Sequence, residues 1–257
     1  MTFLPPGETA VVARLRAAGC VFAEAEARLL ADAAPTPDDL GALVARRVAG
    51  EPLEQLLGWA EFCGLRIAIS PGVFVPRRRT EFLVETAVAL TRPGAVVVDL
   101  CCGSGAVGAA LLAVVPGIQL SAADVEPAAV DCARRNLPAA RVHQGDLFGA
   151  LPDDLRGRVD VLVANVPYVP TAAIARMPPE ARDHEPRTAL DGGPDGLDVA
   201  RRVVAAAPEW LAPGGSVLFE TSRDQSADAV AVVEAAGLVG RLATDDERGA
   251  TVVVGTR

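Results

Sequence analysis

The stretch Val96-Val97-Val98-Asp99-Leu100-Cys101-Cys102-Gly103-Ser104-Gly105-Ala106-Val107-Gly108 decides the fold of this chain. Its apolar, β-branched start predicts a buried strand, and the small residues after it predict a tight turn into a helix. The spacing of Gly103, Gly105 and Gly108 is G-x-G-x-x-G, which lets backbone amides approach a bound ligand closely. That spacing alone is weak evidence for a ligand site, because an ordinary strand-to-helix turn can show it as well.

Strand and helix alternate on the carboxyl side of this stretch. After the strand 96–100 we expect further strands at 120–124, 140–143, 159–165 and 217–220, with helices between them, which implies parallel pairing through right-handed crossovers. Residues 238–243 and 250–255 flank a short polar segment and predict a hairpin, so one strand must be antiparallel. The prediction is a Rossmann-like α/β domain with a seven-stranded, mostly parallel sheet.

The amino-terminal part of the chain has a different pattern. Residues 8–58 are predicted to be helical, with Gly19 ending the first helix and a later helix at 38–49. We expect a small helical domain at 1–61, a β-hairpin linker at 62–76 and the sheet domain at 77–257. The hairpin strands are expected at 65–69 and 73–75, around the breaker Ser70-Pro71-Gly72, and a helix at 80–90 follows.

Composition narrows the class of protein. The 257-residue chain is 51% hydrophobic and carries a net charge of -9, which disfavours a broad nucleic-acid surface and leaves Pro76-Arg77-Arg78-Arg79 as the one dense basic cluster. Its five cysteines are odd in number and lack metal-ligand spacing, so we expect reduced thiols and no metal site. Neither a leader pattern nor a membrane-spanning run is evident, and a cytoplasmic protein is expected.

Polar residues follow several of the expected strands, where open α/β sheets bind ligands. Asp124 ends a strand about 20 residues after the glycine loop, where its carboxylate can accept hydrogen bonds from two ribose hydroxyls. Asp146 suits an adenine amine, with Leu147 packed on the ring, although it could equally cap a helix. Asn165-Val166-Pro167-Tyr168 follows the strand 159–165 and holds the chain's only tyrosine. Alone, this last loop could be a strand-ending turn whose tyrosine covers the core.

The glycine loop together with Asn165-Val166-Pro167-Tyr168 resembles the amino-methyltransferases of the class I S-adenosylmethionine-dependent type, whose motif is Asn/Asp-Pro-Pro-Tyr/Phe. Further segments look like the HemK-type protein-(glutamine-N5) methyltransferases. These segments are 51–58, Glu61-Phe62, Val75-Pro76-Arg77 with Thr80-Glu81, and 185–193 with Asp195-Gly196-Leu197. The resemblance implies S-adenosylmethionine as cofactor and the glutamine of the Gly-Gly-Gln loop of a peptide-chain release factor as substrate. No direct contact with nucleic acid or membrane is expected.

The resemblance also implies roles for single residues. The Asn165 side-chain oxygen and the Val166 backbone carbonyl would accept the two amide hydrogens of the substrate, with Pro167 keeping Val166 extended and Tyr168 stacking on the amide. Cofactor contacts are expected from Asp99, Cys101, Cys102, Gly103, Ser104, Gly105, Asp124, Asp146, Leu147 and Asn165.

Five further residues are candidates for the substrate side of the site. Arg77, Thr80 and Glu81 would fold over the cofactor side, or form a surface helix with Thr80 as its cap. Glu185 and Arg187 would order a substrate-facing loop, or form a buried ion pair that supports a long connection.

The chain departs from the family pattern at two positions. Cys101 stands where the family usually has glycine, which is tolerable if its φ is negative. Val166 stands where the family usually has proline; the carbonyl is kept, but the fixed φ of proline is lost. His143 and His184 are more often structural or solvated than catalytic in such a setting. Methylation of another planar nitrogen and a non-catalytic binding module remain the alternatives.

Overall fold

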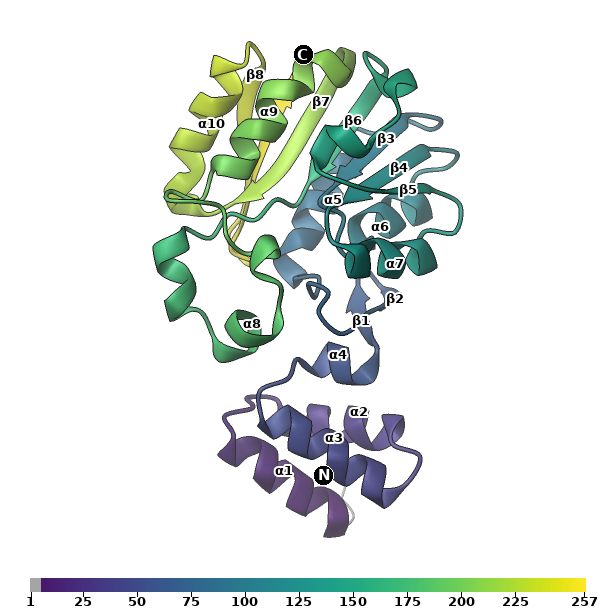
Figure 1. The fold of residues 1–257 in the computed structure, drawn as a ribbon, viewed down its shortest axis with the longest axis vertical. Coiled ribbons are helices and arrows are strands. Elements are labelled where there is room, and N and C mark those ends of the chain that lie inside the picture. The colour runs from purple at the N-terminus through teal and green to yellow at the C-terminus, as the bar shows by residue number, and fades with distance from the viewer. Residues whose placement is uncertain (1–5) are drawn as a thin grey trace.

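The computed structural model describes residues 6–257 and shows a small helical unit below a sheet covered by helices on both faces (Figure 1). The first five residues of the predicted 1–61 domain lie outside the described residues. The helical unit contains α1 (Pro6–Ala17), α2 (Ala23–Ala33), α3 (Pro37–Val48) and α4 (Leu53–Leu57). Gly19 follows α1 in the left-handed region (φ +91°), which ends the helix as predicted. Buried residues such as Leu15, Leu30 and Val44 form a separate small core in this unit.

The central sheet confirms the predicted fold class. Its seven strands lie in the order β5-β4-β3-β6-β7-β9-β8, and β9 is antiparallel to both of its neighbours while the remaining pairs are parallel. The strands are β3 (Val96–Leu100), β4 (Gln119–Asp124), β5 (Arg141–Gln144), β6 (Val159–Ala164), β7 (Leu211–Thr221), β8 (Val239–Asp245) and β9 (Ala250–Thr256). The carboxyl ends of β3, β4 and β6 therefore lie side by side.

Helices bury the two faces of the sheet in separate apolar clusters. One cluster joins the sheet to α5 (Glu81–Val88), α6 (Ala106–Val114) and α7 (Pro127–Asn136), and the other joins it to α9 (Asp198–Trp210) and α10 (Ser226–Ala235). The interior is built mainly from Val, Leu and Ala side chains, as the low aromatic content requires. The connection between β6 and α9 carries the short helix α8 (Pro179–His184) and the 3₁₀ turns Thr171–Arg176 and Arg187–Ala189.

Of the two strands predicted for the amino-terminal hairpin, 65–69 is confirmed and 73–75 is wrong. The structure pairs β1 (Trp59–Phe62) with β2 (Leu65–Ala68), and residues 73–75 form no strand. The turn is Cys63-Gly64, with φ values of +50° and +71°. A two-residue hairpin turn of this kind needs positive φ at both positions, which glycine adopts readily and cysteine rarely. The cysteine therefore conceals the hairpin turn, whereas the more conspicuous Ser70-Pro71-Gly72 forms a turn that joins no pair of strands.

Candidate active site

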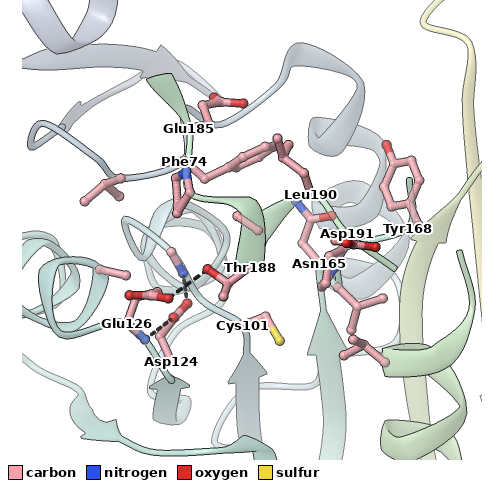
Figure 2. Close-up of a pocket in the computed structure, with 18 of the residues that line it drawn as sticks. Phe74, Cys101, Asp124, Glu126, Asn165, Tyr168, Glu185, Thr188, Leu190 and Asp191 are labelled. Atoms are coloured by element: carbon pink, nitrogen blue, oxygen red, sulfur yellow. Dashed lines mark hydrogen bonds between the residues drawn. The ribbon is translucent and has the colours of Figure 1, made fainter. Parts of the chain in front are cut away.

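A cavity of about 900 Å³ lies at the carboxyl ends of β3, β4 and β6. It is lined by the glycine loop, by the residues after β4 and β6, and by two distant segments near residues 72–80 and 177–193. Its volume is at the upper end of the range for small-molecule pockets. Asp124 and Glu126 lie on one side of it, with Asn165 and Tyr168 across from them (Figure 2). It therefore has room for a cofactor and for part of a second molecule.

The glycine loop is shaped by close packing. A Cβ at Gly105 would lie 2.9 Å from Leu137 Cδ1, and one at Gly108 would lie 2.8 Å from Leu120 Cδ2. Gly103 (φ +55°) and Gly105 (φ +80°) are also in the left-handed region. The φ angles favour glycine at 103 and 105, and the close packing favours it at 105 and 108. Gly103 lies at the edge of the cavity.

Asp124 ends β4 and lies next to the glycine loop. Its Oδ2 accepts a hydrogen bond from the Gly103 amide at 2.8 Å and its Oδ1 one from the Glu126 amide at 2.9 Å. Each carboxylate oxygen can accept a further hydrogen bond, so two hydroxyls can be held as well. Burial raises the pKa of Asp124, and the two backbone amides oppose that rise. The glycine cradle and this carboxylate fit an adenosine cofactor.

Asp99 and Cys102, at the start of the loop, are buried, and Cys101 between them is partly exposed. Asp99 is 1% exposed and accepts a hydrogen bond from the Gly108 amide at 3.0 Å, and burial raises its pKa to about 7. Burial also raises the thiol pKa of both Cys101 and Cys102. Cys101 does not have the negative φ at which cysteine would be tolerated without strain, because its φ is +55°. A non-glycine residue in that conformation costs roughly 1–2 kcal/mol, so Cys101 holds a backbone conformation that favours glycine at the expense of strain.

Asp146 and Leu147 also line the cavity. The Asp146 side chain does not cap the turn that follows it; its Oδ2 instead pairs with Arg202 of α9 at 2.6 Å. Leu147 is at φ +48° and is partly buried against the core.

The loop after β6 presents a polar side chain beside an aromatic ring. Asn165 is half-buried and lines the cavity, and its amide group forms no hydrogen bond within the described part of the chain. Val166 is 2% exposed, with its side chain in the core under α9. The Asn165 amide is therefore available to a ligand, while Val166 can offer only its backbone.

Tyr168 is held by a buried carboxylate that the sequence did not reveal as part of the site. Its hydroxyl donates to Glu220 Oε1 at 2.5 Å, and Arg79 Nε donates to the same oxygen at 2.8 Å. Thr80 occupies the N-cap position of α5, but its side chain does not cap the helix, because its hydroxyl donates to Glu220 Oε2 at 2.8 Å. Burial, together with the charge of Glu220, raises the pKa of Tyr168 well above its usual value. The sequence signal for this contact was Glu220 itself, the single charged residue at the end of the apolar strand 217–220.

The remaining substrate-side candidates separate in the structure. Glu185 is buried, accepts a hydrogen bond from the Val75 amide at 3.2 Å and pairs with Arg77. Arg187 pairs with Asp191, so the buried ion pair exists but joins Glu185 to a different arginine from the one expected. Glu81 does not line the cavity, because its side chain accepts a hydrogen bond from the hairpin amide of Cys63 at 3.0 Å.

Neither histidine lines the cavity. His143 is on β5 and burial lowers its pKa, while His184 is at the end of α8 near Gly50.

Two contacts that connect separate parts of the site were also missed. The Thr188 hydroxyl donates to Glu126 at 2.8 Å, which links the 185–191 segment to the cofactor side of the cavity. Asn136 Nδ2 donates to the carbonyls of Ser104 and Ala68, at 2.8 and 2.9 Å, and so joins the glycine loop to the hairpin. Neither contact follows from local pattern, since the partners are far apart in sequence.

Comparison with known proteins agrees with this geometry. Residues 64–179 match the family model of the methyltransferase small domain. The chain is 41% identical over 228 residues to the release factor glutamine methyltransferase of Geobacter sulfurreducens, covering 86% of this chain and 79% of that protein. It is 38% identical to the 4-amino-L-phenylalanine/4-methylamino-L-phenylalanine methyltransferase of Streptomyces pristinaespiralis, over 80% of this chain and 73% of that one.

A crystal structure of a methyltransferase from Pyrococcus furiosus shares the fold, with a TM-score of 0.58 and 18% identity over 82% of this chain and 96% of that one. Among residues 6–257, no helix is long and apolar enough to cross a membrane. The extent and identity of the sequence match establish what the motifs implied: the chain belongs to the family of release factor glutamine methyltransferases, which are S-adenosylmethionine-dependent enzymes.

Proposed function

We propose that this protein transfers the methyl group of S-adenosylmethionine to the side-chain amide nitrogen of a glutamine, in the Gly-Gly-Gln loop of a peptide-chain release factor. The observation that carries the proposal is the unpartnered amide of Asn165, which lines the cavity next to the anchored ring of Tyr168. Release factors work on ribosomes, so the proposed location is the cytoplasm. The net charge of -9 favours recognition of the factor without direct contact to nucleic acid.

Cofactor binding is assigned to one side of the cavity. The backbone of the glycine loop would lie against the cofactor, Asp124 would accept hydrogen bonds from its ribose hydroxyls, and Leu147 would pack on its adenine ring. Asp99, Cys101, Cys102, Gly103, Ser104, Gly105, Asp146 and Asn165 complete the proposed contacts. When bound, the cofactor supplies an electrophilic methyl group.

The chain's own residues prepare the acceptor nitrogen. A primary amide is a poor nucleophile because its lone pair is delocalised, so the rate must come from alignment and exclusion of water. The Asn165 side-chain oxygen and the Val166 carbonyl would each accept one amide hydrogen and fix the nitrogen's lone pair. Tyr168 would cover the amide plane. Neither His143 nor His184 lines the cavity, so neither is assigned to take the proton, which the nitrogen would release to bulk solvent as the methylated product leaves.

The helical unit is proposed to recognise the protein substrate. Residues 1–61 would form the recognition domain, 62–76 the linker and 77–257 the methyltransferase domain. Glu54, at the start of α4, lines the cavity together with Met177 and Glu180 of the β6–α9 connection. The mouth of the cavity therefore has walls from both parts, as access for a loop of another protein requires. Arg77, Thr80, Glu185 and Arg187 are proposed to shape this entrance, and Glu81 to support the hairpin behind it.

The test uses a release factor with an intact Gly-Gly-Gln loop. Incubation with the protein and S-adenosylmethionine should increase the mass of the factor by one methyl group, located on that glutamine by fragmentation. The matched substrate control is the same factor with that glutamine replaced by asparagine, which should gain no methyl group. Methylation elsewhere, or none, would contradict the proposal.

Asn165→Ala tests the site itself. We expect turnover to be lost while the affinity for the demethylated cofactor, measured by calorimetry, stays within about threefold, because Asn165 acts mainly on the acceptor. Unchanged turnover would remove Asn165 from the mechanism.

A second candidate substrate is a small aromatic amine. The Streptomyces pristinaespiralis relative is named for such substrates and is nearly as similar to this chain as the relative named for release factors. An anilinic nitrogen is also planar, and two acceptors with a covering ring would hold it in the same way. Parallel assays with the release factor and with 4-amino-L-phenylalanine separate the two, and methylation of the amine alone would favour this second function.

A further inference from the structure

Glu220 collects three donors on one buried carboxylate at the end of β7. It is 2% exposed, and it accepts hydrogen bonds from Tyr168, Arg79 and Thr80 at 2.5, 2.8 and 2.8 Å. The Arg79 guanidinium carbon also lies 5.7 Å from the centre of the Tyr168 ring. A buried charge with three donors is costly to disturb, so the phenol hydroxyl has a fixed partner.

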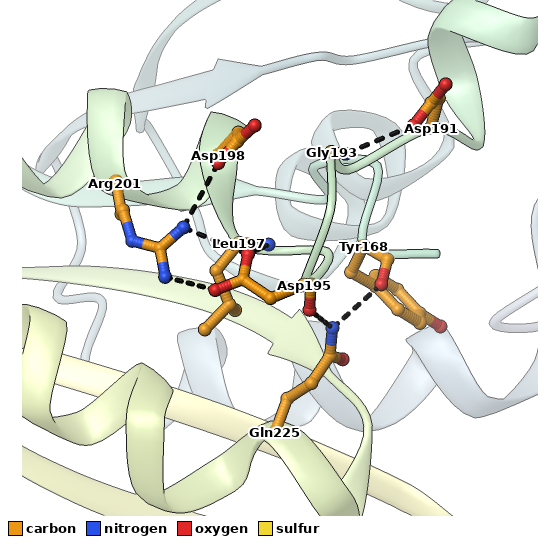
Figure 3. Close-up of polar contacts among 8 residues, drawn as sticks. All are labelled: Tyr168, Asp191, Gly193, Asp195, Leu197, Asp198, Arg201 and Gln225. Atoms are coloured by element: carbon orange, nitrogen blue, oxygen red, sulfur yellow. Dashed lines mark hydrogen bonds and ion pairs between the residues drawn. The ribbon is translucent and has the colours of Figure 1, made fainter. Parts of the chain in front are cut away.

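Gln225, in the turn that follows β7, holds the backbone of the same tyrosine (Figure 3). Its Nε2 donates to the carbonyl of Tyr168 at 3.0 Å and to that of Asp195 at 2.7 Å. Its Oε1 accepts hydrogen bonds from the amide and hydroxyl of Ser222, at 3.2 and 2.7 Å. The side chain thus joins three segments and leaves no donor unused.

We propose that Glu220 and Gln225 are positioning residues for methyl transfer, which act by fixing Tyr168 through its hydroxyl and its backbone carbonyl. Neither residue is assigned to contact the substrate amide. Both come from the end of β7 and the turn after it, so one segment sets the ring and the loop backbone together. Tyr168 lies three residues after Asn165, and a shift of its backbone would move the Val166 carbonyl as well. The inference rests on the proposed function, because it specifies how the acceptor loop (residues 165–168) is held.

Two isosteric substitutions test the kinetic consequence. Glu220→Gln removes the charge that holds the hydroxyl, and Gln225→Glu keeps the acceptor for Ser222 but places an oxygen against two carbonyls. We expect each variant to lower kcat for the protein substrate by about tenfold or more, because small misplacements of reacting groups are costly. The affinity for S-adenosylhomocysteine should stay within about threefold. Asp160→Asn is the matched control: it alters an ion-paired carboxylate at the opposite end of β6 and should leave kcat unchanged.

A double-mutant cycle separates positioning from general stability. If Glu220 acts through the Tyr168 hydroxyl, Glu220→Gln should reduce kcat much less in a Tyr168→Phe background than in the native protein. If Glu220→Gln lowers kcat by the same factor in the Tyr168→Phe background as in the native protein, the proposal is overturned. An unchanged kcat in a folded Glu220→Gln variant would overturn it as well.

Tyr168 also gives a readout that requires no turnover, since it is the only tyrosine in the chain. Burial, and after it the charge of Glu220, raises the pKa of Tyr168; Glu220→Gln removes the second cause, so the pKa should fall and tyrosinate absorbance should develop at lower pH than in the native protein. Identical titrations would show that the contact is not made and would overturn the proposal. If the native protein methylates no release factor, the proposed function fails; the titration still decides whether Glu220 holds the ring.

Discussion

At the residue scale, the proposed acceptor loop, residues 165–168, would divide its work between side chain and backbone. Asn165 offers a side-chain oxygen to the cavity, whereas Val166 has its side chain in the core and contributes a carbonyl. Valine in place of proline therefore keeps the acceptor, and the restraint that proline would supply is shared by Pro167 and by the anchoring of Tyr168. The identity of residue 166 matters less than the groups that hold its carbonyl in place.

Asp99 gives a prediction about pH. Its pKa is raised to about 7 by burial, against about 3.9 in an unfolded chain. Between those values the folded protein binds a proton that the unfolded chain lacks, so the free energy of unfolding falls as pH rises from about 4 to 7. Asp99→Asn keeps an acceptor for the Gly108 amide and abolishes this titration. Above pH ~7 the cofactor-free variant should be more stable than the native protein by up to ~4 kcal/mol.

Urea unfolding of both proteins across this pH window measures the effect. The difference in unfolding free energy should grow with pH through the window and then level off. Two curves that remain parallel would show that Asp99 does not titrate there.

At the scale of elements, residues 192–196, near the end of the connection between β6 and α9, pack against the acceptor loop through glycines. Gly192 and Gly196 are both buried, and a Cβ at either would lie within 2.7 Å of the backbone of Pro167 or Tyr168. Asp191 fixes the same segment by accepting hydrogen bonds from Thr171 and Gly193. This connection therefore forms the outer wall of the acceptor loop.

Gly196→Ala tests that wall, with Gly214→Ala as its matched control. Both glycines are left-handed, at φ +81° and +78°, but a Cβ at Gly196 would lie 2.3 Å from the Tyr168 carbonyl oxygen, and one at Gly214 meets nothing within 4 Å. Each substitution should cost about 1–2 kcal/mol of backbone strain. Gly196→Ala should lose roughly 1–3 kcal/mol more through overpacking, and turnover with it. If the two variants lose the same stability in thermal unfolding and have the same activity, the segment around Gly196 can accommodate a methyl group without disturbing the acceptor loop.

The predictable elements were those with a local signal. Apolar runs identified the strands of the sheet, and Gly103, Gly105 and Asp124 pointed to the edge of the sheet, because turn chemistry and strand ends depend on neighbouring residues. Gly103 and Asp124 line the cavity there. The pairing of Glu220 with Tyr168, and of Glu185 with Arg77, could not be predicted in this way. These partners are 52 and 108 residues apart in sequence, and only the closed sheet brings them together.

At the scale of the whole molecule, Arg47 joins the helical unit to the β6–α9 connection. Its guanidinium pairs with Glu26 of α2 at 2.7 Å and with Glu180 of α8 at 3.0 Å, and its side chain is 10% exposed. It also donates to the Glu51 carbonyl at 3.0 Å. One arginine thus links the proposed recognition domain to the wall of the cavity.

Arg47→Met should destabilise the protein by about 3 kcal/mol or more, because Glu26 would be left buried without a partner. It should also raise KM for the protein substrate with little change in cofactor affinity. Arg46→Met is the control on the adjacent position, since Arg46 forms an exposed pair with Glu51 and should cost less than about 1 kcal/mol. Equal shifts in thermal unfolding for the two variants would contradict the role of Arg47.

The position of β9 between β7 and β8 has a consequence for biosynthesis. During translation β8 leaves the ribosome before β9, the strand that connects it to the sheet. One edge of β7 therefore stays open until residues 250–256 have been made. Glu220 pairs across that edge with Val252. The glycine loop and its neighbouring strands are therefore made early, whereas β7, which holds Tyr168 through Glu220, gains its second neighbour only when β9, the last strand of this sheet in the sequence, has been made.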